Sequence, residues 1–150
     1  MQVREIIQLK GGVLFTATPQ QSLASAIDTM ASLDVGSLVV MQDGKMAGML
    51  TFREVMLALK AHTSGTNDVL VGDVMVKAPV TAHLDMEAND LRRLMIEKHS
   101  RYLPVLDGDT LMGVISFLDV AKAVLEEQSF ENKMLKSYIK NWPAEGEPQI

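Results

Sequence analysis

The sequence predicts an α+β protein made of two β-α-β-β-α repeats packed pseudo-twofold, followed by a C-terminal amphipathic helix. An offset of 65 aligns residues 13–60 with 78–125 without a gap. Within that alignment the stretch "GMLTFREV" at Gly48 returns as "GVISFLDV" at Gly113. Such regularity indicates two copies of one supersecondary unit that share a core.

Each copy opens with a short strand, over residues 13–17 and 79–83. A helix follows, because apolar residues recur at helical spacing. These residues are Leu23, Ile27, Met30 and Leu33 in the first copy, and Leu91, Leu94 and Met95 in the second.

A hairpin and a last helix complete each copy. Apolar strands at 37–41 and 102–106 lead to turns at Asp43-Gly44 and Asp107-Gly108, and return strands follow. The last helix begins near Thr51 in the first copy and near Ser116 in the second.

Shorter segments surround the repeats. "VREII" (3–7) matches "VGDVM" (71–75) after a three-residue shift, so "QLKGGV" is longer than its counterpart. The polar residues 62–68 form a linker. We therefore expect domains at 10–67 and 75–131, with a C-terminal helix and frayed tail at 132–150.

An apolar stripe marks the C-terminal helix, because Phe130, Met134, Tyr138 and Trp142 recur every four residues. The stripe can pack on the protein's own surface, across a dimer, or against a partner protein. We expect the last residues, 143–150, to fray.

Composition excludes several classes of function. A net charge of -5 argues against nucleic-acid binding. The absence of Cys excludes disulfides and thiolate metal sites, and no apolar run is long enough for a membrane span. The three His lack metal-ligand spacing, and no catalytic trio is visible. We expect a cytoplasmic protein that is not an enzyme and holds no metal.

The motifs Thr51-x-x-Glu54 and Ser116-x-x-Asp119 have two interpretations. A hydroxyl at the N-cap and an acid three residues later form a capping box. Each motif also follows a strand, where a helix N-terminus presents N–H groups to an anion and the acid can accept bonds from a diol. The sequence pattern alone leaves both interpretations open.

The two copies resemble a tandem pair of cystathionine-β-synthase (CBS) domains, also called a Bateman module. The resemblance rests on "VGDVM", "SRYLPVLDGDTLMGVISFLDV" and "GSLVVMQDGKMAGMLTFREV" and covers about residues 3–127. It implies two pseudo-twofold-related clefts that take adenosine-containing ligands: AMP, ADP, ATP, NAD or S-adenosylmethionine.

The resemblance also implies a role for particular residues. In one cleft Ser116 and Asp119 hold the sugar beside Val114, and Arg101 and Arg53 face phosphate. The base pocket of that cleft is lined by Val13, Leu14 and Phe15. The opposite cleft uses Thr51 and Glu54 against Ala78, Pro79 and Val80.

Two residues depart from the family pattern. Glu54 stands where the family has Asp, and Gly36 stands at the counterpart of Arg101. The longer side chain of Glu54 moves the carboxylate outward by one methylene. We therefore expect the Asp119 cleft to retain ribose binding and the Glu54 cleft to be weaker.

The predicted function is that of a regulatory sensor. An adenine nucleotide, AMP first and ADP, ATP or NAD as alternatives, binds between the repeats and changes assembly or partner binding. Cationic S-adenosylmethionine suits arginines less well. We expect a homodimer or larger homo-oligomer and an unidentified protein target. The alternative is a protein-interaction module with vestigial clefts.

Overall fold

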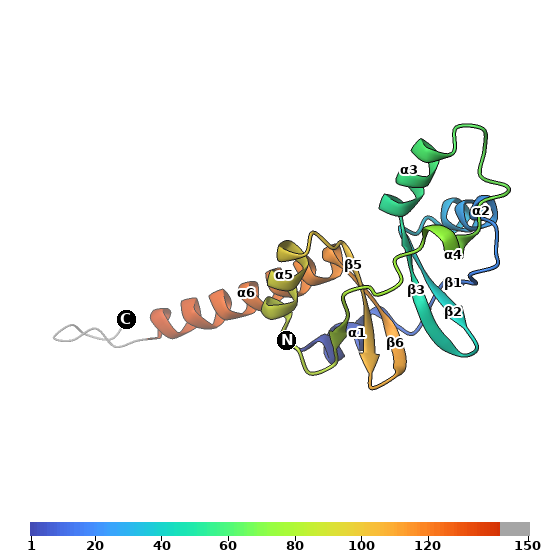
Figure 1. Ribbon diagram of the computed structural model, residues 1–150. Coiled ribbons are helices and arrows are strands. Elements are labelled where there is room, and N and C mark those ends of the chain that lie inside the picture. Colours follow the sequence, from blue (N-terminus) through green and yellow to red (C-terminus); the bar gives the residue numbers. More distant parts are fainter. Residues whose placement is uncertain (142–150) are drawn as a thin grey trace.

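The structure, a computed structural model, describes residues 1–141 and contains two three-stranded sheets with helices around them (Figure 1). The predicted α+β fold with two repeats is confirmed. The first repeat contains β1 (Thr16–Ala17), α2 (Leu23–Leu33), β2 (Ser37–Gln42), β3 (Lys45–Thr51) and α3 (Phe52–Ala61). The second contains β4 (Ala82–His83), α5 (Ala88–Glu97), β5 (Tyr102–Asp107), β6 (Thr110–Ser116) and α6 (Phe117–Lys140). Two short helices precede the repeats, α1 (Val3–Lys10) and α4 (Val71–Val74).

The opening strand of each repeat is shorter than predicted. Both sheets have the same order, β1-β2-β3 and β4-β5-β6, so the opening strand lies at an edge and pairs with one neighbour only. That parallel pairing covers two residues in each copy, such as Thr16 with Val39 and Ala17 with Val40. Because only two residues of each opening strand pair with its single neighbour, the strand is short.

The hairpin turns follow the chemistry of their residues. Gln42 pairs with Lys45, which puts Asp43 and Gly44 at the centre of the first turn, with φ of 52° and 77°. Positive φ at both positions fits the twist of a two-residue hairpin.

The second turn lies one residue later than predicted. Asp107 pairs with Thr110, so Gly108 and Asp109 are central and Asp107 belongs to the strand. Gly108, with φ of 61°, takes the first central position, where a positive φ favours glycine.

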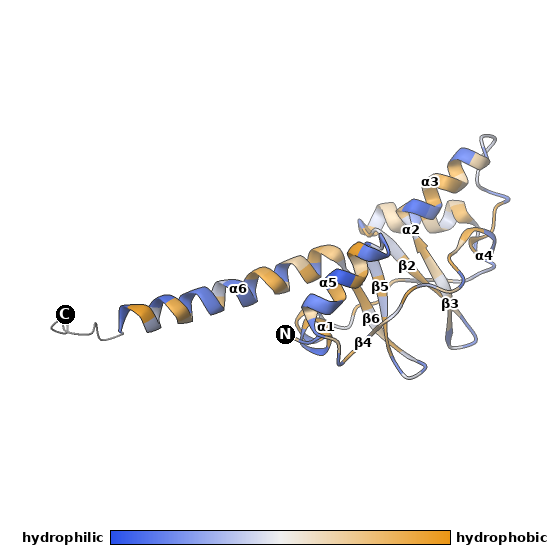
Figure 2. Ribbon diagram, turned by 60° about the vertical axis from the view of Figure 1, so that its left-hand side comes forward, coloured by the Kyte–Doolittle hydropathy of each residue, from blue (hydrophilic) through white to orange (hydrophobic). Residues whose placement is uncertain are grey.

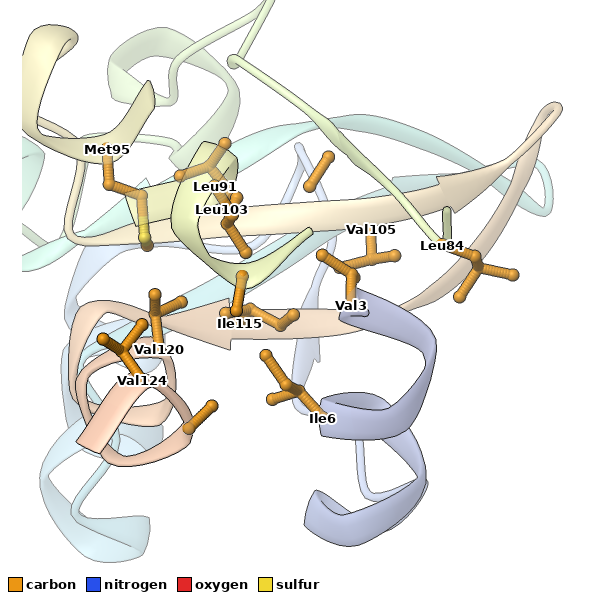
Figure 3. Close-up of a cluster of buried hydrophobic side chains, with 13 residues drawn as sticks. Val3, Ile6, Leu84, Leu91, Met95, Leu103, Val105, Ile115, Val120 and Val124 are labelled. Atoms are coloured by element: carbon orange, nitrogen blue, oxygen red, sulfur yellow. The ribbon is translucent and has the colours of Figure 1, made fainter. Parts of the chain in front are cut away.

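The leading helices are exchanged between the repeats. Val3 and Ile6 of α1 are buried in the core of the second repeat, among Leu103, Ile115 and Val120 (Figure 3). Val3 N donates to Met86 O at 2.8 Å.

The helix α4 makes the reciprocal contact with the first repeat. Val71 is fully buried in the core of that repeat, and its N–H donates to Gln21 O at 2.9 Å. Gly72 N donates to Pro19 O, also at 2.9 Å. Each core is thus completed by the segment that precedes the other repeat in the chain.

The repeated glycines lie beneath these exchanged segments. A Cβ on Gly113 would approach Ile7 Cδ1 of α1 to 2.9 Å. A Cβ on Gly48 would collide with the backbone carbonyl of Val76, which follows α4 and forms a bridge with Met49. Both copies have glycine where another segment lies against the strand, but only at Gly48 is the contact with backbone.

We predict that Gly48→Ala lowers the free energy of unfolding by about 1–3 kcal/mol, the usual cost of overpacking. Gly113→Ala should cost less, because the flexible end of Ile7 can move aside whereas the carbonyl of Val76 cannot. Urea denaturation of the two variants measures the difference. Equal losses would show that the backbone crossing at Val76 imposes no special constraint.

The C-terminal helix is not a separate element. The last helix of the second repeat, α6, runs without interruption from Phe117 to Lys140. A division at residue 132 is therefore not seen, because the helical pattern of the repeat continues directly into the apolar stripe. Figure 1 shows α6 projecting from the rest of the molecule.

Beyond Glu127, the helix α6 makes no buried contacts. All residues from 128 to 141 are exposed. Figure 2 shows hydrophobic residues recurring along this part of the helix. Five of them are at least 57% exposed, namely Phe130, Met134, Leu135, Tyr138 and Ile139, so the stripe is not buried against any part of residues 1–141. Trp142 and residues 143–150 lie outside the described residues. Within residues 1–141, no helix is both long and apolar enough to cross a membrane.

We predict that truncation after Glu127 leaves both repeats folded but weakens self-association. The removed part of α6 buries nothing in the monomer, whereas its exposed apolar side chains suit a contact between copies. Analytical ultracentrifugation over a concentration series measures the association, and circular dichroism checks folding. Unchanged association of the truncated chain would contradict the prediction.

Candidate functional site

Both strand-to-helix turns form the predicted capping boxes. In the second repeat, Ser116 N donates to Asp119 Oδ2 at 2.9 Å and Asp119 N donates to Ser116 Oγ at 3.1 Å. In the first, Glu54 Oε1 accepts from both Thr51 N (2.9 Å) and Thr51 Oγ1 (2.7 Å). The extra methylene of Glu54 thus lets one carboxylate oxygen take two donors from the N-cap residue.

A pocket of about 710 Å³ opens between the repeats at the turn of Glu54. The first turn of α3 forms one wall, and residues 76, 78–80 and 98–102 form the others. This volume lies within the range of about 300–1,000 Å³ that is usual for small-molecule sites. Seven of the predicted site residues line it, namely Thr51, Arg53, Glu54, Ala78, Pro79, Val80 and Arg101.

The arginines lie in a different cleft from the one expected. Arg53 and Arg101 line the pocket of Thr51 and Glu54, not a cleft with Asp119. Arg53 is next to Glu54 in the first turn of α3, which explains its position. The carbonyl of Arg101 does accept a bond from Phe117 N at 2.8 Å, near the turn of Asp119, but Arg101 is among the residues that line the pocket of Glu54.

The pocket combines a buried carboxylate with exposed basic residues. Glu54 is only 7% exposed, and four basic residues share the lining with it. Sequence reasoning found Arg53 and Arg101 but missed the other two, Lys98 and His99. The signal was the run "KHSR" at 98–101, with three basic residues in four. In a chain of net charge -5, this local excess of positive charge suits an anion.

The turn of Asp119 is occupied by a side chain of the protein itself. Lys10 Nζ, at the end of α1, donates to Asp119 Oδ2 at 2.7 Å and to Val114 O at 2.8 Å. The structure thus brings Val114, Ser116 and Asp119 together as predicted, but with a lysine among them.

The predicted base pocket of this cleft is open. Val13 is 73% exposed, Leu14 is half-buried, and Phe15 packs against the core of the first repeat. These three residues therefore do not enclose a ligand as arranged here.

Comparison with known proteins gives the family. The sequence profile of the CBS domain matches residues 4–61 and 71–126. The chain belongs to the CBS-domain family. It is 30% identical over 115 residues to the CBS domain-containing protein YhcV of Bacillus subtilis, a match that covers 76% of this chain and 81% of that protein.

Solved CBS structures share the fold. The CBS domain NE2398 superposes with a TM-score of 0.78 at 29% identity, over 83% of this chain and 98% of that one. CBSX2, solved in complex with AMP, superposes with a TM-score of 0.70 at 24% identity, over 85% and 98% of the two chains. The match to CBSX2 establishes a common fold.

The two CBS repeats carry different charges at equivalent positions. His99 and its counterpart Asp34 share a left-handed conformation, both with φ of 53°, so the offset of 65 holds at this loop. All four basic residues of the pocket are replaced in the other repeat. Arg53, Lys98, His99 and Arg101 correspond to Leu118, Leu33, Asp34 and Gly36.

Gly36, the counterpart of Arg101, has no room for a side chain. A Cβ at this position would collide with the hydroxyl of Tyr102 and approach Phe52 Cε2 to 2.8 Å. Tyr102 and Phe52 both line the pocket. The space that a side chain at position 36 would need is therefore taken by the aromatic wall of the Glu54 pocket.

The pair of Lys10 and Asp119 is electrostatically coupled. Burial raises the pKa of Asp119, but the bonds from Lys10 and from the backbone of Ser116 lower it by more, so the net pKa lies below its ordinary value. A lowered folded-state pKa stabilises the fold above the unfolded pKa of about 3.9, and this contribution disappears as pH falls through the folded pKa.

We predict that Lys10→Met lowers the free energy of unfolding at pH 7 by up to about 1 kcal/mol, because the pair is partly exposed. The difference from the unsubstituted protein should shrink as the pH is lowered from about 5 to 2.5. Urea denaturation across this range measures it, with Lys77→Met as a control at an exposed lysine. A difference that persists undiminished in acid would show that Asp119 is not the partner that matters.

Proposed function

We propose that the chain is a regulatory module that binds an adenine nucleotide, AMP most readily, in the pocket of Glu54, Arg53 and Arg101. Binding between the two repeats changes their packing and, through it, assembly or the binding of a protein partner. The observation that carries the proposal is the group of four basic residues around a buried carboxylate at a helix N-terminus.

The chemistry of the pocket supports a nucleotide in three ways. The basic residues supply counter-charges for phosphate, and guanidinium groups can bind it in a bidentate manner. Glu54 uses Oε1 for both bonds to Thr51, so the cap does not occupy Oε2, which can accept from ribose hydroxyls. Ala78, Pro79 and Val80 offer an apolar wall for a flat base.

The choice of adenine rests on the family. The fold relative CBSX2 was solved with AMP, which is a statement about that protein and a guide for this one. ADP, ATP and NAD present the same adenosine group and differ in phosphate. S-adenosylmethionine carries a positive charge and is disfavoured by the same four basic residues. We propose no catalysis by this chain itself.

This choice of cleft reverses the ranking expected from the sequence. The substitution of Glu for Asp suggested a weak site at residue 54. We expect the basic residues of the pocket to add more binding affinity than the displaced carboxylate of Glu54 removes. The Asp119 cleft has Leu118 and Gly36 at the counterparts of the two arginines.

We predict that Arg101→Ala weakens AMP binding at least tenfold, since a bond to a charged group contributes about 1.5–3 kcal/mol. The binding of adenosine, which lacks phosphate, should change little. Isothermal titration calorimetry with both ligands separates the phosphate contribution from the rest.

Arg93→Ala is the matched control. Arg93 lies on α5, is 73% exposed, and does not line the pocket. It removes the same charge from the same repeat and should leave AMP affinity unchanged. Equal losses of AMP affinity in the two variants would show that only the overall charge matters. Unchanged AMP affinity in Arg101→Ala would contradict phosphate binding at Arg101.

A protein-interaction module is the second candidate function. The exposed stripe on α6 favours it, because Phe130, Met134, Leu135 and Ile139 offer an apolar contact surface on a projecting helix. A homodimer or larger homo-oligomer through this stripe is compatible with nucleotide sensing. A chain that associates through α6 but binds none of the five adenosyl ligands would support interaction alone.

A further inference from the structure

We infer that Lys10 is an internal ligand of the second cleft, so that the chain binds one nucleotide instead of two. The ammonium group occupies the acceptors that a ribose would need at Asp119. This inference deepens the proposed function, which concerns the Glu54 pocket, but it can be tested separately.

The geometry of Lys10 is that of a bound ligand. Its Nζ donates to Val114 O at 2.8 Å and to Asp119 Oδ2 at 2.7 Å. The same Oδ2 also accepts from Ser116 N at 2.9 Å. A ribose hydroxyl is a neutral donor, whereas the ammonium group of Lys10 adds charge–charge attraction to its hydrogen bond with the Asp119 carboxylate. A nucleoside would therefore have to displace a better donor.

Nothing at the counterpart positions compensates for that displacement. In the Glu54 pocket a phosphate meets Arg53 and Arg101, whereas the equivalent residues of the second cleft are Leu118 and Gly36. A nucleotide that expelled Lys10 would thus remove a cation from Asp119 without finding those two cations for its phosphate. The bond from Lys10 to Asp119 and the lack of counterparts to Arg53 and Arg101 therefore both oppose nucleotide binding in the second cleft.

The asymmetry arises from three extra residues. The stretch around "QLKGGV" is three residues longer than its counterpart in the second copy. The helix α1 has eight residues and ends at Lys10, whereas α4 has four and ends at Val74. Because α1 is longer, its last residue, Lys10, reaches Asp119. The lysine that follows α4, Lys77, lies outside any helix and is exposed.

Counting bound ligands tests the inference. Equilibrium dialysis and calorimetry with AMP and with adenosine should give one site per chain in the unsubstituted protein and two in Lys10→Met. The new site should bind adenosine and AMP about equally, because the counterparts of the two arginines are absent from it. Lys10→Arg, which keeps the charge, and Lys77→Met should both stay at one site.

The variant Lys10→Met/Asp119→Asn identifies the new site. It should return to one site per chain, because the acceptor for the sugar is lost while the Glu54 pocket is untouched. Circular dichroism confirms that each variant is folded.

The possible outcomes separate the two proposals. If Lys10→Met gains no additional binding site, the inference is overturned. It is also overturned if the unsubstituted protein has two sites and Lys10→Met loses one, because Lys10 would then bind phosphate. An unsubstituted protein with no site contradicts the proposed function. If Lys10→Met then gains one site that requires Asp119, the role of Lys10 stands on its own.

Discussion

The exchange of leading helices is the constraint on which the rest of the structure depends. Val3 and Ile6 complete the core of the second repeat, and Val71 completes that of the first. Without the helix that precedes the other repeat, each repeat would expose apolar core residues. The two repeats therefore depend on each other for folding. The segment after α4 leaves no room for a Cβ at position 48, and the end of Ile7 lies close to Gly113. The pocket of Glu54 is lined by residues from both of these interlocked repeats.

A symmetric scaffold then carries two different sites. The capping boxes are alike, because every helix that starts at such a turn must satisfy its free N–H groups. The surrounding residues are free to diverge. One turn has acquired Arg53, Arg101 and an aromatic wall, and the other has acquired a lysine from a lengthened helix. The charges around the two turns therefore differ, with four basic residues lining the pocket of Glu54 and Lys10 bonded to Asp119.

The sequence predicted what depends on local pattern. The repeat, the helix starts at Thr51 and Ser116, and the hairpins follow from spacing and turn chemistry, and the structure confirms them except for a one-residue shift at Gly108. The short opening strands were predicted too long, because a single strand's pattern does not reveal that it has one neighbour.

The distribution of site residues was harder to predict, since it depends on contacts distant in sequence. The backbone of Arg101 is bonded to Phe117, yet Arg101 lines the pocket of Glu54, and no local sequence pattern predicts that position. Lys10 is 109 residues from Asp119. The three-residue insertion was visible in the sequence, but its effect appears only once α1 is packed on the second repeat.

A crystal structure of the protein grown with AMP tests the central claim most directly. The account predicts one nucleotide per chain, with its phosphate beside Arg53 and Arg101, its ribose beside Glu54, and the bond from Lys10 to Asp119 intact. A nucleotide bound at Asp119 with Lys10 displaced, while the Glu54 pocket stays empty, would contradict it.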